Sequence, residues 1–134
     1  MRTLSVPITL DRRFQLWSYQ VSHSVVLLRS MIAPGVDTRM DLMFRSVRAM
    51  ELRQRYDLLT VDVVSAQDAS RMFGLEHSET EGRHVFSLAN GHGQKGYVVA
   101  GSMFLAEDDL SEFEPSSIDH RDLAGRIIRE LEYS

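Results

Sequence analysis

The sequence of 134 residues contains no cysteine. Disulfides, thiol nucleophiles, cysteine-ligated zinc and iron–sulfur clusters are therefore excluded. Proline is scarce, with three residues, and Lys95 is the one lysine among 15 basic residues. The longest stretch with few polar residues, 97–106, falls well short of the roughly 20 residues that a membrane-spanning helix needs. We therefore expect a chain that neither spans a membrane nor relies on covalent cross-links.

The amino-terminal stretch MRTLSVPITLDRR lacks the apolar core and the small-residue cleavage site of a secretory signal peptide. This predicts a cytoplasmic protein. The apolar fraction of 43% and the charged fraction of 25% are ordinary for a soluble globular domain. Because the sequence has no internal repeat or linker, its length predicts a single domain over residues 1–134.

The charged residues are unevenly distributed along the chain, whose net charge is −4. Residues 1–57 contain nine arginines and five acidic residues, whereas residues 106–134 contain three arginines and nine acidic residues. This distribution predicts that the two parts lie against each other and partly neutralise. The alternative is a basic surface for an anionic partner. The sequence has no Lys/Arg run with interleaved aromatic residues, which argues against nucleic acid as that partner.

The stretch 14–30, FQLWSYQVSHSVVLLRS, holds the only tryptophan and the densest run of β-branched residues. A short break at residues 22–24 divides it, which predicts the central hairpin of an antiparallel sheet. With strict alternation, Trp17 and Tyr19 share one face while Phe14 lies on the other. Bulky side chains on both faces predict cover on both faces, as in a barrel or a sandwich.

Residues 39–57 present the most ambiguous pattern. Their residue types favour a helix, but the charged residues fall almost entirely on odd positions and most large apolar residues on even positions. This period of two predicts two strands, about 40–45 and 48–53, joined by a bulge near Ser46. Met43 stands alone among the odd-numbered charges, which predicts an exposed patch or a dimer contact.

The remaining segments complete the expected architecture. Further strands are expected over residues 58–64, 84–88 and 97–105. Ser65 and Gly74 predict a capped helix over residues 66–73. A carboxy-terminal helix is predicted from an apolar stripe at i, i+3, i+4 and i+7, formed by Ala124, Ile127, Ile128 and Leu131. The expected fold class is α+β: a mostly antiparallel, strongly curved sheet, or a barrel or sandwich, of about seven strands with these two helices.

The segment 91–96, GHGQKG, matches the G-x-G-x-x-G pattern of dinucleotide-binding folds. In those folds a helix follows the glycines, and its amino terminus holds the pyrophosphate. Here the apolar residues 97–99 follow, which predicts a strand and makes the segment a glycine-rich hairpin connection. At the tip of this connection, His92 and Lys95 are predicted to contact an anionic group.

The sequence contains no recognisable catalytic or metal-binding constellation. Its histidines are His23, His77, His84, His92 and His120. None is paired with another at i+2 or i+4, the spacings that direct two imidazoles at one ion, so no metal is expected. Ser102 lacks the G-x-S-x-G motif that exposes a serine nucleophile on a turn. We therefore expect no catalytic residue and no cofactor.

Residues 16–30, LWSYQVSHSVVLLRS, followed by TRMDLMF-x-x-V at residues 38–47, resemble a group of small uncharacterised bacterial proteins of actinobacterial type. The likeness covers about residues 13–64. The group has no assigned activity, so the resemblance implies no site residue, cofactor or partner.

The sequence therefore predicts a non-enzymatic binding or protein-interaction module. Trp17 and Tyr19 form an aromatic wall and Arg45 supplies a nearby cation, which makes these three residues the predicted contacts. The alternative is a small β-barrel ligand carrier or enzyme with a pocket inside the sheet, in which His23 or His84 acts as acid or base. Because sheets with open edges pair with other chains, a homodimer is expected, and a protein partner or a small ligand is left open.

Overall fold

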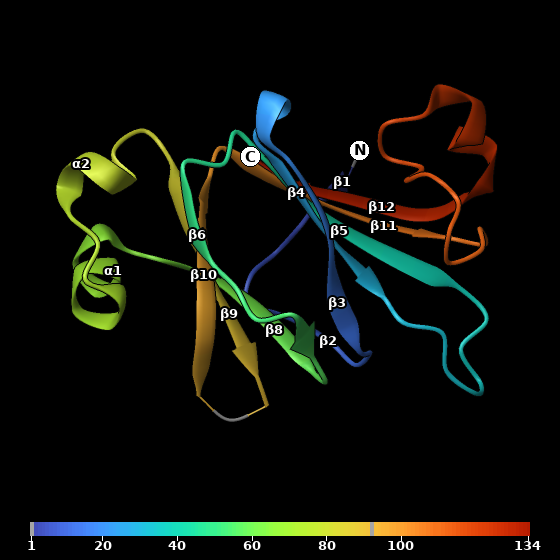
Figure 1. Ribbon diagram of the computed structural model, residues 1–134, viewed down its shortest axis with the longest axis horizontal. Helices are drawn as coiled ribbons and strands as arrows, with labels where there is room; N and C mark the ends of the chain where they lie inside the picture. Colours follow the sequence, from blue (N-terminus) through green and yellow to red (C-terminus); the bar gives the residue numbers. More distant parts are fainter. Residues whose placement is uncertain (1, 92) are drawn as a thin grey trace.

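A computed structural model of the chain describes residues 2–91 and 93–134 and contains two β-sheets packed face to face (Figure 1). The strands are β1 Arg2–Thr3, β2 Ile8–Leu10, β3 Phe14–Gln20, β4 Val25–Ser30, β5 Arg39–Arg45, β6 Ala49–Glu51, β7 Arg55–Tyr56, β8 Leu59–Val64, β9 His84–Asn90, β10 Gln94–Ala100, β11 Ser102–Asp108 and β12 Ile127–Tyr133. The helices are η1 Val21–His23, α1 Ala66–Phe73, α2 His77–Thr80 and η2 Arg121–Arg126, of which η1 and η2 are 3₁₀ helices.

One sheet has seven strands in the order β1-β12-β11-β5-β4-β3-β7, and the other has five in the order β2-β8-β9-β10-β6. The five-stranded sheet is antiparallel, while the seven-stranded sheet is mixed because β1 runs parallel to β12. The protein is thus a mostly-β α+β protein, as the fold class predicted. Neither sheet is closed or strongly curled, so the barrel and the strongly curved sheet are wrong and the sandwich alternative describes the arrangement.

The chain passes repeatedly from one sheet to the other. In sequence, β2 of the five-stranded sheet lies between β1 and β3 of the seven-stranded sheet, and β6, β7 and β8 alternate in the same way. The single strand predicted over residues 97–105 is wrong: β10 and β11 lie in different sheets, separated by Gly101. Each sheet is therefore assembled from segments that are distant in sequence.

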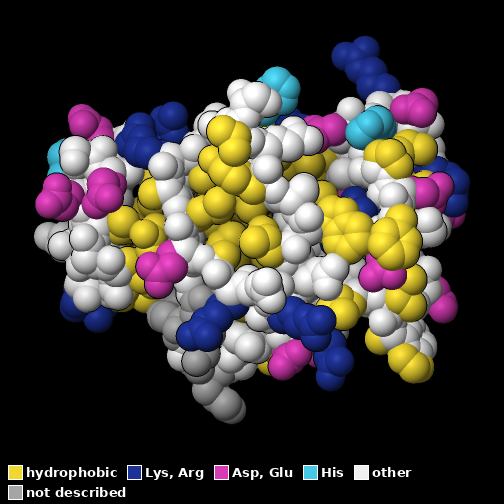
Figure 2. Space-filling view, in the orientation of Figure 1, with side chains coloured by type: hydrophobic (Ala, Val, Ile, Leu, Met, Phe, Trp, Pro, Cys, Tyr) yellow, Lys and Arg dark blue, Asp and Glu magenta, His cyan; other side chains and the backbone are white. Residues whose placement is uncertain are grey.

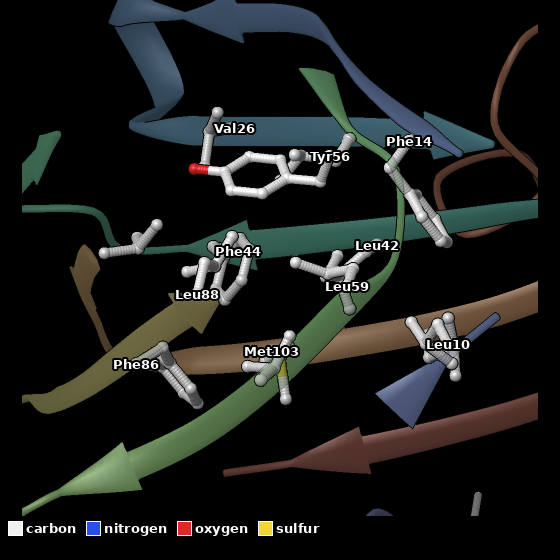
Figure 3. Packing of buried hydrophobic residues seen from close by; sticks show 14 of the residues in the cluster. Leu10, Phe14, Val26, Leu42, Phe44, Tyr56, Leu59, Phe86, Leu88 and Met103 are labelled. Atoms are coloured by element: carbon white, nitrogen blue, oxygen red, sulfur yellow. The ribbon is translucent and has the colours of Figure 1, made fainter. Parts of the chain in front are cut away.

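The hydrophobic core fills the space between the two sheets. Figure 3 shows side chains of the two sheets pointing toward one another; those that it labels are Leu10, Phe14, Val26, Leu42, Phe44, Tyr56, Leu59, Phe86, Leu88 and Met103. The rings of Phe44 in β5 and Phe86 in β9 meet across the interface, with centroids 5.2 Å apart. The sheets are thus held together mainly by the burial of apolar surface.

The hairpin predicted over residues 14–30 is confirmed as β3, η1 and β4. The prediction that Trp17 and Tyr19 share a face is wrong. The register of β3 against β4 shifts at Trp17, which is an extra residue in a β-bulge. Trp17 consequently packs with Leu27 on the outer face of the sheet, whereas Tyr19 stands opposite Val26, whose side chain lies in the core.

Residues 39–57 form strands, as their alternation predicted, and no helix lies in this fully described segment. The predicted bulge between two strands is wrong, because the segment forms β5, β6 and β7 in alternate sheets. Ser46, with a φ of 56°, turns the chain out of β5. Met43 is 2% exposed, so the prediction that it is exposed is also wrong. It packs on the outer face with Phe104 and Ile118, and Ile118 belongs to the acidic carboxy-terminal part of the chain.

The helix predicted over residues 66–73 is confirmed as α1. The hydroxyl of Ser65 accepts a hydrogen bond from the N–H of Asp68 at 3.1 Å, and Gly74 ends the helix with a φ of 70°. Ala69 is fully buried against Val99 on the outer face of the five-stranded sheet. This helix therefore covers that face through apolar contact.

The predicted carboxy-terminal helix is wrong. Only the short η2 forms there, and residues 127–133 are the strand β12, paired with β11. Leu131 and Tyr133 pack against the core, and Ile128 is exposed. The apolar stripe fits helical spacing, but pairing along the whole length of β11 outweighs that local preference.

The glycine-rich connection joins β9 and β10 in an antiparallel hairpin, as predicted. At Gly96 the backbone passes so close to the carbonyl oxygen of Glu51 and the hydroxyl of Tyr56 that a Cβ atom would collide with them. His92 lies outside the described residues, and so does the side chain of Lys95. None of the helices in the described part of the chain is long and apolar enough to cross a bilayer.

Candidate binding site

Four charged side chains lie buried on the outer face of the seven-stranded sheet. Arg29 donates two hydrogen bonds to Asp41, at 2.8 and 3.0 Å, and Arg39 donates two to Asp108, at 3.0 and 3.1 Å. Asp41 also lies 3.8 Å from Arg39, so the four groups form one chain of alternating charge across β4, β5 and β11. None of these residues is more than 4% exposed. Burial at this depth is stable because every charge is paired and hydrogen-bonded.

The two arginines also hold residues 109–126, which we call the strap, across the outer face (Figure 1). Their remaining N–H groups donate to carbonyl oxygens of Ser111, Glu112, Glu114 and Pro115 at distances of 2.6–3.0 Å. The hydroxyl of Ser117 donates to Asp108 at 2.8 Å. Ion pairs between the first and last parts of the chain, as the charge distribution predicted, are Arg12–Glu107, Arg39–Asp108 and Arg45–Asp119.

The strap and β3 enclose a cleft of about 280 Å³, which we call the Trp17 cleft. Trp17 of β3 and Phe113 of the strap form its walls, with ring centroids 5.8 Å apart. Apolar side chains of the sheet also line it: Val25, Leu27 and Met43. The guanidinium carbon of Arg29 lies 4.8 Å from the centroid of the Trp17 ring, which orients the indole by a cation–π contact.

A second, more open cleft of about 480 Å³ adjoins the first and is called the Arg45 cleft. Both clefts are lined by Gln20, Val25, Asp119 and His120. Arg45 forms an ion pair with Asp119 and lies over the ring of Phe104, with its guanidinium carbon 4.6 Å from the ring centroid. His23 and Ser46 complete the lining of this cleft. We call the two clefts together the outer groove.

The charged side chains along the outer groove already have partners. Arg29 is paired with Asp41, and Arg45 with Asp119. The carboxylate of Glu114 accepts a hydrogen bond from the backbone N–H of Ser111 at 2.6 Å, which lowers the pKa of Glu114. The groove therefore presents apolar surface, two compensated ion pairs and the hydrogen-bonded carboxylate of Glu114. On the face of the molecule that Figure 2 shows, hydrophobic side chains reach the surface, and charged side chains lie mostly around its margins.

His120 is the imidazole with a defined orientation in the groove. Its Nδ1 lies 2.9 Å from the carbonyl oxygen of Ser116. Because a carbonyl oxygen can only accept, Nδ1 carries the hydrogen of this bond. Among the described residues, no three His, Asp or Glu side chains are placed to hold a metal ion. The imidazole of His120 is therefore a hydrogen-bonding group in the lining of both clefts.

Two of the three residues predicted as contacts line the outer groove, and the third does not. Trp17 and Arg45 both line the outer groove, in adjoining clefts. Tyr19 lies on the other side of β3, away from the clefts, because of the bulge. His23, named as an acid or base in the alternative, lines the Arg45 cleft, whereas His84 packs edge-on against Tyr133 at the end of the core. The cation beside Trp17 is Arg29, not Arg45.

Sequence reasoning missed the residues that the strap contributes to the groove, Phe113, Asp119 and His120. The segment around them is polar and irregular, so no periodicity marks it. The sequence of β5 contains a clue to this cover. Arg39 and Asp41 lie on the outer face of the strand, and no predicted element packs on that face. Charges on a face that also carries Met43 indicate that an acidic segment covers that face.

No protein-family model, no curated protein and no solved structure matches this chain. The resemblance of residues 13–64 to small uncharacterised bacterial proteins therefore stays a prediction.

Proposed function

We propose that the protein is a non-enzymatic binding module whose ligand occupies the outer groove. The observation that supports this most directly is the composition of the groove: an aromatic wall of Trp17 and Phe113, an apolar lining, and charges that are already compensated. Ligand sites typically combine an apolar concave surface with a few polar groups that fix orientation. A ligand that adds a charge here would have to compete with existing ion pairs, so the expected ligand is uncharged and partly apolar.

The alternative of a pocket inside the sheet gains no support from the core. Apolar side chains of both sheets pack in the space between them (Figure 3). The residues that line the two clefts of the groove are not members of this core cluster. His84, one of the two acid or base candidates, is packed edge-on against the rings of Phe86 and Tyr133. We therefore develop the binding-module proposal alone.

The proposal can be tested with the fluorescence of Trp17, because it is the only tryptophan in the chain. A library of uncharged fragments, including capped aromatic and aliphatic amino-acid amides, is screened for changes in its emission. A ligand at 100 times its Kd should also raise the free energy of unfolding by about 2.7 kcal/mol. We expect fragments that change both signals.

A matched pair of variants locates the binding. Ser18 is exposed and lines the Trp17 cleft, so Ser18→Glu introduces a charge there without touching the core. Ser70 is exposed on α1, on the far side of the other sheet, so Ser70→Glu is the control. Fragments should lose affinity for Ser18→Glu and keep it for Ser70→Glu. Fragments that stabilise the protein but leave Trp17 emission unchanged and bind both variants equally would place the ligand elsewhere and contradict the proposal.

A further inference from the structure

The edge of β3 beside the outer groove is open. In the described chain, β7 pairs with β3 at Phe14 and Gln15 alone, while β3 continues to Gln20. The N–H of Leu16 donates to the carbonyl oxygen of Gln54 at 2.8 Å. Beyond that bond, no described strand runs along this side of β3.

The register of β3 shows which backbone groups point out of this edge. Leu16 stands opposite Leu28 and Tyr19 opposite Val26. Leu28 and Val26 are two residues apart on β4, so Leu16 and Tyr19 occupy the same kind of site in the antiparallel ladder. Because the N–H of Leu16 points away from β4, the N–H and C=O of Tyr19 do as well. Tyr19 therefore presents a donor and an acceptor to any strand that approaches.

Apart from the bulge at Trp17, this edge carries neither charge nor proline, two features that usually prevent strand pairing. Residues 14–28 contain neither a charged residue nor a proline. Tyr19 is 42% exposed and Val21 is 75% exposed, so apolar surface accompanies the open backbone. At the other side of the same sheet, the part of β12 that does not pair with β1 carries Arg129 and Glu130. The sheet thus carries charge at one edge and none at the edge beside the groove.

We propose that the ligand of the outer groove is an extended peptide segment of a partner protein, which adds to the edge of β3 as a further strand. Its backbone pairs with Tyr19, and one of its large apolar side chains enters the Trp17 cleft. In this mode main-chain hydrogen bonds give affinity and pockets for alternate side chains give specificity. The inference rests on the proposed function, since it names the class of ligand for the same groove.

The size and charge of the site define the segment. The Trp17 cleft, at about 280 Å³, lies below the roughly 300–1,000 Å³ of sites for drug-sized molecules, which suits a single side chain. The edge of β3 is uncharged, and both arginines of the groove are held in the ion pairs Arg29–Asp41 and Arg45–Asp119. The carboxylate of Glu114 disfavours an anion beside them. The segment is therefore uncharged where it contacts β3 and apolar at alternate positions.

The first experiment uses capped hexapeptides that alternate threonine with a variable residue. The variable residue is phenylalanine or leucine in the test peptides and glutamate in the control. We expect the apolar peptides to change the emission of Trp17 and to bind at least about tenfold more tightly than the glutamate peptide, a difference of about 1.4 kcal/mol. Ser18→Glu should weaken the apolar peptides and Ser70→Glu should not.

The second experiment asks whether the peptide backbone takes part. N-methylation removes one backbone donor at a time and leaves every side chain in place. In strand addition, methylation at alternate positions should weaken binding about tenfold, whereas the positions between them, whose N–H groups face away, should tolerate it. Binding should also slow the hydrogen exchange of the Tyr19 amide.

Three outcomes would overturn the inference. If uncharged fragments bind at the groove but no N-methylation weakens any peptide, the proposed function stands and strand addition fails. If none of the peptides changes Trp17 emission at millimolar concentration, the inference fails irrespective of the fragments. If sedimentation shows a homodimer that Ser18→Glu dissociates and Ser70→Glu does not, a second copy of the chain occupies the edge instead.

Discussion

The outer faces of the two sheets are covered in different ways. On the five-stranded sheet, α1 and the residue after its cap bury Ala69 and Leu75 against Val85 and Val99. On the seven-stranded sheet, the strap is held by hydrogen bonds from buried arginines to its backbone, and Ile118 adds one apolar contact with Met43 and Phe104. Apolar contact brings the helix down onto its sheet. In the strap, the hydrogen bonds from Arg29 and Arg39 fix the backbone of residues 111–115 at the distance that these long side chains span. The outer groove lies beside this part of the strap.

The largest expected effect comes from removing the anion that Arg29 and Arg39 share. Asp41→Ala leaves Arg29 buried without its partner and should lower the free energy of unfolding by about 3–5 kcal/mol. Urea denaturation measures this loss. The exposed pair Arg13–Asp57, at 3.6 Å, is the control, because Asp57→Ala should cost less than about 1 kcal/mol. Equal losses for the two variants would show that the strap does not depend on the buried charges.

A smaller loss is expected on the face covered by α1. Leu75 is 4% exposed, and Leu75→Ala should lower the free energy of unfolding by about 2–3 kcal/mol through lost burial and a residual cavity. Ile128→Ala, at a residue that is 60% exposed, should change it by less than about 0.5 kcal/mol. Hydrogen exchange sharpens the contrast between the faces. It should speed up in the strap for Asp41→Ala and stay unchanged there for Leu75→Ala.

The wall of the Trp17 cleft should matter for binding and not for folding. Phe113 is 83% exposed, so Phe113→Ala should change the free energy of unfolding by less than about 0.5 kcal/mol. The same change should weaken the phenylalanine hexapeptide by about three- to tenfold, since aromatic contacts contribute about 0.5–1.5 kcal/mol. Ile32→Ala, at another exposed apolar residue outside the groove, is the control. A variant that unfolds easily but binds normally would contradict the assignment.

The smallest expected effect concerns the pKa of Glu114. The backbone N–H of Ser111, and then its hydroxyl, lower this pKa below the ordinary value of 4.5. A lowered pKa in the folded state means that ionised Glu114 stabilises the turn of the strap above the ordinary value. That stabilisation is lost as the pH falls through the lowered pKa. An NMR titration should place the midpoint below 4.5, and Ser111→Ala should raise it only part of the way, because the backbone N–H stays.

Local sequence patterns predicted much of the fold. The helix over residues 66–73 and the strands between residues 39 and 57 follow from caps and alternation, which depend on neighbouring residues alone. The carboxy-terminal helix was wrong because Leu131 and Tyr133 owe their conformation to pairing with β11, a contact that spacing does not reveal. The division at Gly101 was missed for a similar reason, since β10 and β11 are both apolar and differ only in the sheet that they join.

The candidate site was predicted only in part. Trp17 and Arg45 line the groove, but a single extra residue in β3 placed Tyr19 on the opposite side. A period of two cannot anticipate a bulge, because the inserted residue is defined by the partner strand. The wall formed by Phe113 depends on where the strap crosses the sheet. That position is set by buried arginines far away in sequence.

The interleaving of the sheets has a consequence for cooperativity. Neither sheet is encoded by one uninterrupted stretch, so a fragment that ended at Gly101 would contain β2, β6, β8, β9 and β10 but would lack β11 and β12. The missing strands would leave the inward side chains of the five-stranded sheet without part of their partner layer. We therefore expect the whole chain to melt as one unit, with calorimetric and van't Hoff enthalpies that agree.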